Sequence, residues 1–287
     1  MSRIVYVNGR YLPYAQAAVH VEDRGFQFAD AIYEVCQVRE GCLVDEARHM
    51  ARLARSLSEL MIPAPMSAPA LAHVMRETIK RNRVRVGIVY LQVSRGAGPR
   101  EFVFPSEDVP RTVVCIARPV APDPHVALAE EGIAVRTMPD VRWGRCDIKT
   151  VMLLPACLAK EVARGQGARE AWLVDKDGFV TEGASSNAWI VSSEGSVITR
   201  PIAPSILAGV TRATLFDVLR EEKVAYLERP FRVAEALAAR EAFITSATNT
   251  VMPVVRIDGT PIGDGKPGPL TRRLRSKFDQ FAAISGA

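Results

Sequence analysis

The sequence predicts an α+β fold built from two domains, and three observations lead to this prediction. Helical and strand-like patterns mix along the chain without the regular alternation of a doubly wound sheet. The 287 residues are 48% hydrophobic and 24% charged, an ordinary globular composition at a length that suffices for two domains. Three of the six residues in Pro119–Pro124 are prolines, which favours a linker there. We therefore expect domains at residues 1–120 and 121–287.

In the first half, two tight turns and one helical pattern are the clearest elements. Residues 4–7 predict a strand that enters a hairpin turn at Asn8–Gly9, and a second hairpin is expected around Glu40–Gly41. Residues that recur at helical spacing predict the first helix: His49, Leu53, Leu57 and Leu60. The other expected elements are strands at 32–38, 42–44, 87–94 and 112–120, and a helix at 69–82.

The second half reads as strands with three helices. We expect strands at residues 133–137, 171–174, 188–191, 242–246 and 254–257. The helices are expected at 152–165, at 212–222 and after Pro269.

Composition excludes several classes of function. The net charge is +5, but Lys and Arg are interleaved with acids and form no basic block, so we expect no nucleic-acid partner. The five cysteines form no CxxC pair and predict free thiols in a reducing compartment. The four histidines are scattered, so we expect no metal site. No signal core or membrane-spanning apolar run is evident, and we expect a cytoplasmic protein with no membrane partner.

Lys149 is the first residue that suggests chemistry. It lies in Asp147–Thr150, just before the apolar run 151–154. Taken alone it could be a surface residue ahead of a helix. The functional alternative is an amine that becomes neutral and attacks an aldehyde, which burial and neighbouring cations favour.

Three further segments have an ordinary interpretation and a functional one. Glu182, at the end of the strand in Val180–Asn187, is either an exposed acid or a carboxylate that holds a protonated ring nitrogen. The segment Ala208–Arg212 is a helix cap, and its free N–H groups also suit a phosphate. The last segment, Glu22–Val35, is a loop that enters an amphipathic strand.

Together, in the same order and at compatible spacings, these four segments resemble the D-amino-acid transaminases of the fold-type IV (class IV) aminotransferase family. The similarity extends over nearly the whole chain, from Tyr6–Gly9 to Gly263–Lys266. The resemblance implies pyridoxal 5'-phosphate (PLP) as the cofactor. It also implies the fold-type IV arrangement of two α+β domains, with the cofactor in the cleft between them and the Schiff-base lysine in the second domain.

The resemblance also assigns roles at the cofactor. It implies that Lys149 is the Schiff-base lysine and the base that moves the proton between the substrate Cα and the cofactor C4′. Glu182 would pair with the pyridine nitrogen, and Arg52 would bind the phosphate unless it is only a surface ion pair. The remaining cofactor-binding residues are expected to be Ser185 and Ser186 near Glu182, Leu207 against the ring, Val210 and Thr211 in the phosphate cup, and Thr248 in a second phosphate loop.

Substrate recognition departs from the family at one position. Tyr33 and Arg100 match two members of the family's binding site for the substrate α-carboxylate. The family pattern around the arginine is Arg-x-His, whereas this chain has Phe102 in place of the histidine, so a third donor is missing. Phe102 and Trp143 are expected to line the substrate pocket. In the family the arginine comes from the neighbouring subunit, which implies a homodimer.

The function expected from the resemblance is two-step transamination. The amino group of a D-amino acid, by default D-alanine, would pass to a 2-oxo acid such as 2-oxoglutarate. The same fold hosts branched-chain L-amino-acid and (R)-amine transaminases and an aminodeoxychorismate lyase, and these remain alternatives. A PLP-binding protein that has lost turnover and serves as a carrier or regulator is the remaining alternative.

Overall fold

The computed structural model describes residues 3–121, 123–282 and 284–285, and the chain divides into two compact units. The first contains Met1–Ala121, Ile148–Met152 and Ala283–Ala287, and the second contains Pro122–Asp147 and Leu153–Ala282. The break after Ala121 falls within the expected linker, of which Pro122 lies outside the described residues. Two segments differ from the expected division, because Ile148–Met152, with Lys149, and Ala283–Ala287 belong to the first unit.

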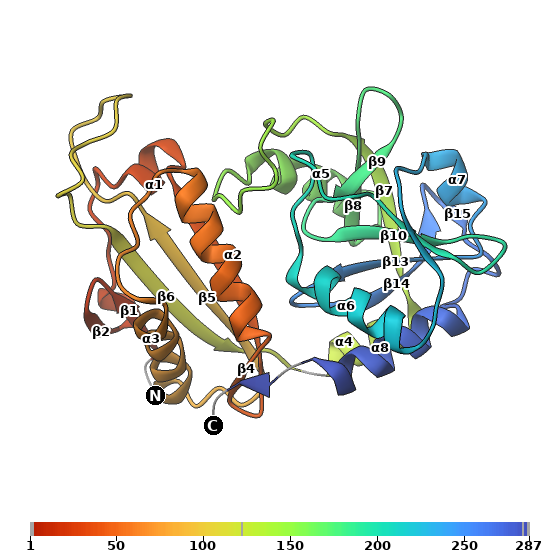
Figure 1. Cartoon of the computed structure of the whole chain (residues 1–287), viewed down its shortest axis with the longest axis horizontal. Helices are drawn as coiled ribbons and strands as arrows, with labels where there is room; N and C mark the ends of the chain where they lie inside the picture. The colour runs from red at the N-terminus through yellow and green to blue at the C-terminus, as the bar shows by residue number, and fades with distance from the viewer. Residues whose placement is uncertain (1–2, 122, 283, 286–287) are drawn as a thin grey trace. The chain divides into compact units, whose positions relative to one another are not determined.

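The first unit is built on an antiparallel sheet with the strand order β16-β4-β3-β5-β6-β1-β2 (Figure 1). Both predicted hairpin turns are confirmed. Asn8 and Gly9, and likewise Glu40 and Gly41, have positive φ, as a two-residue turn with the twist of the strands requires. The strands are β1 (Ile4–Val7), β2 (Arg10–Pro13), β3 (Ala31–Arg39), β4 (Cys42–Val44), β5 (Gly87–Ser94), β6 (Thr112–Pro119) and β16 (Ile284–Ser285).

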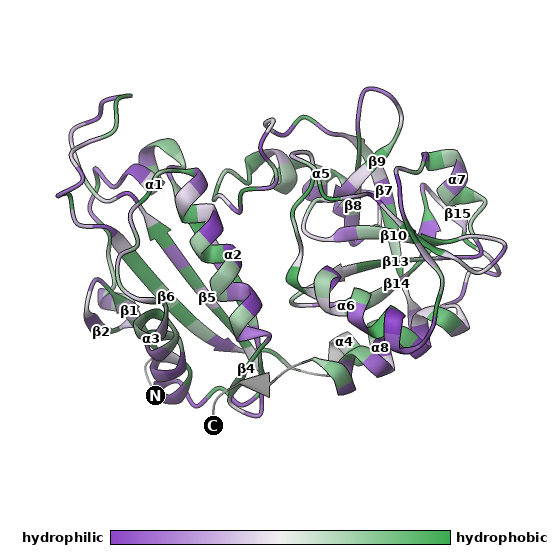
Figure 2. Cartoon of the chain, viewed as in Figure 1, coloured by the Kyte–Doolittle hydropathy of each residue, from purple (hydrophilic) through white to green (hydrophobic). Residues whose placement is uncertain are grey.

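Two long helices of the first unit pack on its sheet. The helix α2 (Glu46–Glu59) contacts β3, and α3 (Ala68–Arg81) contacts β6, β1 and β5. The predicted helical spacing is confirmed, since His49, Leu53 and Leu57 are buried along α2. Figure 2 shows that hydrophobic and hydrophilic residues alternate along α2, a pattern that allows one face of the helix to be buried. The short elements η1 (Tyr14–Gln16) and α1 (Arg24–Phe28) complete the unit.

The second unit contains a mixed sheet with the strand order β12-β11-β10-β13-β14-β7-β8-β9, with β15 paired to β14. The pairs β7–β8, β7–β14 and β11–β12 are parallel and the others are antiparallel. The strands are β7 (Ile133–Pro139), β8 (Glu170–Val174), β9 (Val180–Gly183), β10 (Asn187–Val191), β11 (Val197–Thr199), β12 (Tyr226–Glu228), β13 (Glu241–Ser246), β14 (Thr250–Ile257) and β15 (Thr260–Pro261).

Helices connect and cover these strands. They are α4 (Asp123–Glu131), α5 (Leu154–Gly165), α6 (Val210–Glu221), α7 (Val233–Leu237) and α8 (Pro269–Phe281). Glu241, at the start of β13, caps the N-terminus of α8 although it is remote in sequence. Its buried carboxylate accepts hydrogen bonds from the N–H groups of Leu270 and Thr271. None of the helices in the described part of the chain is long and apolar enough to cross a membrane.

The helix expected to begin at Met152 begins instead at Leu154. Pro155 lies in its first turn, where a missing N–H costs nothing, and the two residues before Leu154 do not belong to the helix. This late start leaves Lys149 outside any helix, and an isolated antiparallel bridge joins Thr150 to Ile32 at the start of β3.

Candidate active site

The backbone around Lys149 is held at three points within the first unit. The Tyr33 N–H donates to the Lys149 carbonyl oxygen over 3.0 Å, and the Val151 N–H donates to the Ala31 carbonyl oxygen over 3.1 Å. The Lys149 N–H donates to the Ser56 hydroxyl oxygen of α2 over 3.3 Å. The position of the Lys149 Cα is therefore set by β3 and α2 together.

The Lys149 amine lies over the ring of Tyr33. Its Nζ atom is 4.2 Å from the ring centroid, and Tyr33 stacks on Tyr90 with centroids 5.7 Å apart. The Tyr90 hydroxyl donates to Gln92, and burial raises the pKa of Tyr90 to about 12, so this phenol is neutral at physiological pH. Lys149 is half-buried over an aromatic pair, which favours the functional interpretation over that of a surface residue.

Arg52 forms a buried ion pair rather than a surface one. Its Nε and Nη2 atoms donate to the Glu34 carboxylate over 2.8 and 2.7 Å, and His49 Nδ1 lies 2.7 Å from the same carboxylate. Glu34 is fully buried on the face of β3 that α2 covers. Neither Glu34 nor His49 was predicted from the sequence as a partner of Arg52. Glu34 lies on the same face of β3 as the buried Ile32 and Cys36, and an acid at such a position indicates a buried cationic partner.

This buried cluster predicts a loss of stability in acid. Burial alone would raise the pKa of the Glu34 carboxyl, but Arg52 and His49 lower it from its usual 4.5 to about 2. Burial also lowers the pKa of His49, although the neighbouring Glu34 carboxylate opposes that shift. A depressed carboxyl pKa stabilises the fold above pH 4.5, and that stabilisation is lost as the pH falls towards 2.

The expected contribution of Glu34 to the free energy of unfolding is about 3 kcal/mol at pH 7. Urea unfolding of the wild type and of Glu34→Gln between pH 6 and pH 2 measures it. The difference in unfolding free energy between the two proteins should shrink as the pH falls below 4.5. A difference that stays constant between pH 6 and pH 2 would show that the pKa of Glu34 is not lowered in the folded protein.

Glu182 is the corresponding buried acid of the second unit. Its carboxylate accepts hydrogen bonds from Arg142 Nη1 at 2.6 Å, Asn187 Nδ2 at 3.0 Å and the Leu207 N–H at 3.1 Å. Asp140 binds the other side of the Arg142 guanidinium. Burial opposes the charge on Arg142, but the two carboxylates raise its pKa. Glu182 is therefore buried and hydrogen-bonded, and the alternative that it is only an exposed surface acid is wrong.

Asn187 connects Glu182 to the start of α6. Its Nδ2 also donates to the Leu207 carbonyl oxygen over 3.0 Å. Its Oδ1 occupies the space that a side chain at position 209 would need, because a Cβ added to Gly209 would lie only 2.1 Å from this oxygen. Only glycine fits at the N-cap of α6, and no side chain caps the helix. The first-turn N–H groups of Val210 and Thr211 therefore form a cradle of the kind that binds phosphate.

The predicted serines of this unit have other partners. The hydroxyls of Ser185 and Ser186 donate to Glu170 over 2.7 and 3.1 Å, rather than to Glu182. Thr248 is exposed in the turn between β13 and β14, with its hydroxyl 3.4 Å from that of Ser246. Roles for these residues at the cofactor stay predictions.

The predicted substrate residues lie on two different segments. Arg100 and Phe102 belong to the loop between β5 and β6, where both are exposed and lie near the Phe28 ring, 5.4 and 5.8 Å from its centroid. Phe102 is 83% exposed, which is unusual for a phenylalanine. Trp143 lies in the second unit and is half-buried.

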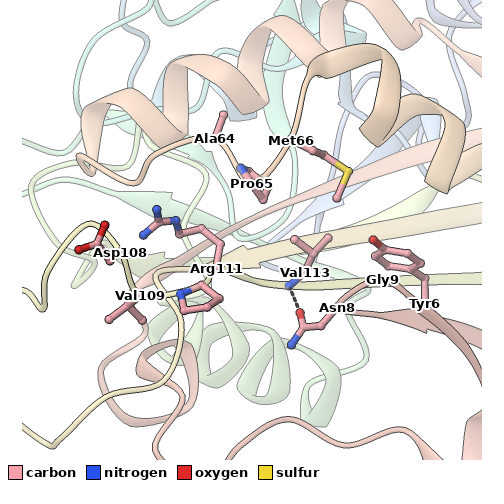
Figure 3. A pocket seen from close by; sticks show the side chains of 11 residues that line it. Tyr6, Asn8, Gly9, Ala64, Pro65, Met66, Asp108, Val109, Arg111 and Val113 are labelled. Carbon is pink, nitrogen blue, oxygen red and sulfur yellow. Dashed lines mark hydrogen bonds between the residues drawn. The ribbon is translucent and has the colours of Figure 1, made fainter.

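The first unit has a separate hollow of about 420 Å³. It lies between the β1–β2 turn, residues 64–66 and residues 108–111, and Figure 3 shows Asn8 on its wall, where the side chain accepts a hydrogen bond from the Val113 N–H. Its lining includes none of the predicted site residues, so the hollow is distinct from the site around Lys149. Within the described residues, no cluster of acids, histidines and cysteines is placed to hold a metal ion.

The residues present fit PLP. The first unit contains an amine whose backbone is fixed and which lies over an aromatic ring. The second unit contains a carboxylate that accepts a hydrogen bond from a guanidinium, and a helix N-terminus that only glycine can cap. An aldehyde, a ring nitrogen and a phosphate require these three kinds of group.

Comparisons with known proteins agree with this chemistry. The chain is 37% identical over 277 residues to a D-alanine aminotransferase from Staphylococcus haemolyticus, covering 96% of this chain and 97% of that one. It is 38% identical over 272 residues to a D-alanine aminotransferase from Bacillus licheniformis, covering 95% and 94%.

Solved structures share the fold. A branched-chain amino acid aminotransferase from Escherichia coli superposes with a TM-score of 0.89 at 23% identity, covering 98% of this chain and 95% of that one. A hypothetical aminotransferase from Mycobacterium tuberculosis in a PLP-bound form gives 0.83 at 22% identity, covering 96% and 97%. The family model for amino-transferase class IV matches residues 31–257, which include every proposed cofactor residue from Arg52 to Thr248. This chain belongs to the class IV aminotransferase family.

Proposed function

We propose that this protein is a D-amino-acid transaminase that moves the amino group of a D-amino acid, by default D-alanine, to a 2-oxo acid such as 2-oxoglutarate. The observation that carries the proposal is the fixed Lys149 amine over Tyr33, in a class IV aminotransferase chain. The relatives that match at 37% and 38% identity over nearly their whole length are D-alanine aminotransferases, which supports the choice of donor.

Lys149 has two tasks in this proposal. Its Nζ atom would hold the cofactor covalently, and once freed by the amino donor it would act as the base that moves a proton between the substrate Cα and the cofactor C4′. When bound, PLP supplies a ring that accepts the electron pair left by the departing Cα proton. The hydrogen bonds that fix the Lys149 backbone set the point from which its side chain would reach the substrate.

The other residues hold the two ends of the cofactor. Glu182, whose carboxylate accepts a hydrogen bond from Arg142, would bind the pyridine nitrogen and favour its protonated form. In this proposal Arg52 and the first-turn N–H groups of α6 would bind the phosphate, and Thr248 would contribute from its turn. Leu207, whose backbone is tied to Glu182 and Asn187, packs against the ring, and Ser185 with Ser186 supports the strand end.

Donor selectivity follows from the carboxylate-binding residues. We propose that Tyr33 and Arg100 bind the substrate α-carboxylate, which fixes the enantiomer whose Cα–H bond points at Lys149. Phe102 and Trp143 line the pocket without donating hydrogen bonds to the carboxylate. We expect the loss of the family's histidine at position 102 to weaken carboxylate binding rather than to reverse the stereochemistry.

We also propose that the protein is a cytoplasmic homodimer. On α5, Leu154, Leu158 and Val162 recur every four residues and are 68%, 60% and 43% exposed, so one face of this helix is apolar and uncovered. An exposed apolar stripe of this kind marks an interaction surface. All five cysteines are free thiols, which fits a reducing compartment.

Branched-chain L-amino-acid transamination is the second candidate, because Phe102 departs from the D-specific pattern and the E. coli branched-chain enzyme shares the fold. Steady-state assays with D-alanine, L-leucine and an (R)-amine, each with 2-oxoglutarate, separate the candidates. We expect D-alanine to give the highest kcat/KM, with one acceptor consumed for each donor. L-leucine as the best donor would refute the D-amino-acid assignment, and consumption of the acceptor in step with the donor would argue against the lyase.

A further inference from the structure

The loop that carries Arg100 leaves the sheet after β5 and returns at β6, and its base is built around Asp30. The Asp30 carboxylate binds two arginines at once. Arg24 Nε lies 2.7 Å from Oδ2, while Arg95 donates from Nε to Oδ2 over 2.7 Å and from Nη2 to Oδ1 over 3.0 Å. The side chains of Arg24, Arg95 and Asp30 are only 3%, 5% and 9% exposed. Charge-assisted bonds at such low exposure are strong and directional.

Arg24 binds the loop on both sides of Arg100. Its Nη1 donates to the carbonyl oxygen of Glu101, the residue next to Arg100, over 2.6 Å. Its backbone N–H donates to the Gly96 carbonyl oxygen over 2.9 Å. The four residues between Gly96 and Glu101 therefore start and end at fixed points.

Arg95 ties the same loop to the end of α2. Its Nη2 and Nη1 atoms donate to the carbonyl oxygens of Leu60 and Met61 over 2.7 and 2.8 Å. Beyond Arg100, the Phe104 ring lies under the Arg95 guanidinium, with its centroid 3.6 Å from Cζ. The loop thus has a second attachment on the far side of Arg100.

We propose that Arg24, Asp30, Arg95 and Phe104 are positioning residues, which set the direction of the Arg100 guanidinium and so make the enzyme selective for amino donors with a carboxylate. This inference rests on the proposed function, in which Arg100 binds that carboxylate. Arg100 itself is exposed and its ring neighbour Phe28 lies 5.4 Å away, so its orientation depends on the backbone that carries it. A displacement of about 1 Å in such a group can cost on the order of 100-fold.

Arg24→Lys is the sharpest test. A lysine keeps the charge near Asp30 but lacks the fork that reaches Asp30 and the Glu101 carbonyl at the same time. We expect KM for D-alanine to rise at least ~10-fold, while kcat at saturating donor and the absorbance spectrum of the bound cofactor stay close to wild type. Arg76→Lys is the matched control, because Arg76 on α3 pairs with Glu46 on α2 and binds neither Asp30 nor the Glu101 carbonyl oxygen, and its KM should be unchanged.

Phe104→Leu is a second test that does not depend on the folding of Arg24→Lys. The Phe104 ring is half-exposed, so another apolar side chain can replace it without unfolding the protein. Removing the ring under Arg95 should raise KM about threefold with an unchanged unfolding midpoint. An unchanged KM in both Arg24→Lys and Phe104→Leu would overturn the proposal.

A double-mutant cycle with Arg100→Ala separates this inference from the proposed function. If the network acts through Arg100, Arg24→Lys should add little to the rise in KM that Arg100→Ala causes alone. Fully multiplicative effects on KM would overturn the positioning role while leaving the role of Arg100 intact. An Arg100→Ala enzyme with wild-type KM would instead refute carboxylate binding by Arg100, and with it the reason for the network.

Discussion

Replacing Lys149 by alanine is expected to lower the rate of transamination by ~10²–10⁴-fold or more. The variant loses both the covalent attachment of the cofactor and the base that moves the Cα proton. The fold should persist, because the hydrogen bonds that hold this segment to Tyr33 and Ser56 come from the Lys149 backbone. The measurement is kcat with D-alanine and 2-oxoglutarate, together with the absorbance of the protein after incubation with PLP.

Lys277→Ala is the matched control for this substitution. Lys277 is a half-exposed lysine on α8 that pairs with Glu222, and its loss should leave turnover and cofactor absorbance unchanged. Normal turnover in Lys149→Ala would remove the central assignment, whatever the substrate.

Glu182→Gln is expected to lower kcat by about 10²–10³-fold. The glutamine has the size of the acid but not its charge, so the pyridine nitrogen loses the partner that keeps it protonated. Arg142 would then face a neutral amide where it now donates to a carboxylate over 2.6 Å. The measurement is kcat for D-alanine at saturating PLP, which separates lost turnover from lost cofactor binding.

The control for this change is Glu194→Gln, an acid fully exposed in the turn after β10. It should retain wild-type kcat. A Glu182→Gln enzyme with more than half of the wild-type kcat would contradict the role of Glu182 at the ring nitrogen.

The sequence predicted best what depends on local chemistry. The hairpins at Asn8–Gly9 and Glu40–Gly41 follow from residues that accept positive φ, and the helix through His49 and Leu57 follows from its own spacing. The segment Ala208–Arg212 was recognised as a helix start for the same reason, and α6 begins within it at Val210.

Partners brought together from distant elements could not be predicted in this way. Glu34 of β3 binds Arg52 of α2, and Arg142, in the segment after β7, binds Glu182 of β9. Pairing between remote segments leaves no periodic trace in either segment. The same reason explains why Lys149 was expected in the second domain, although its segment pairs with the start of β3 in the first unit.

The Arg100 loop illustrates a further limit. The segment Glu22–Val35 contributed to the resemblance. Nothing in its pattern predicts that Arg24 binds the Glu101 carbonyl oxygen, or that Asp30 binds the guanidiniums of Arg24 and Arg95. Ser185 and Ser186 show the converse, since they are adjacent to the Glu182 strand in sequence but donate to Glu170.

The most direct test of the account is a single half-reaction. The purified PLP-loaded protein is mixed with D-alanine or L-alanine, in the absence of any 2-oxo acid, and the change in cofactor absorbance that accompanies amino-group transfer is followed. The account predicts that D-alanine converts the cofactor and L-alanine does not, and that Lys149→Ala converts it with neither. Conversion by L-alanine alone would contradict the D-amino-acid assignment, and a wild-type protein that shows no cofactor absorbance after PLP is added would contradict the account as a whole.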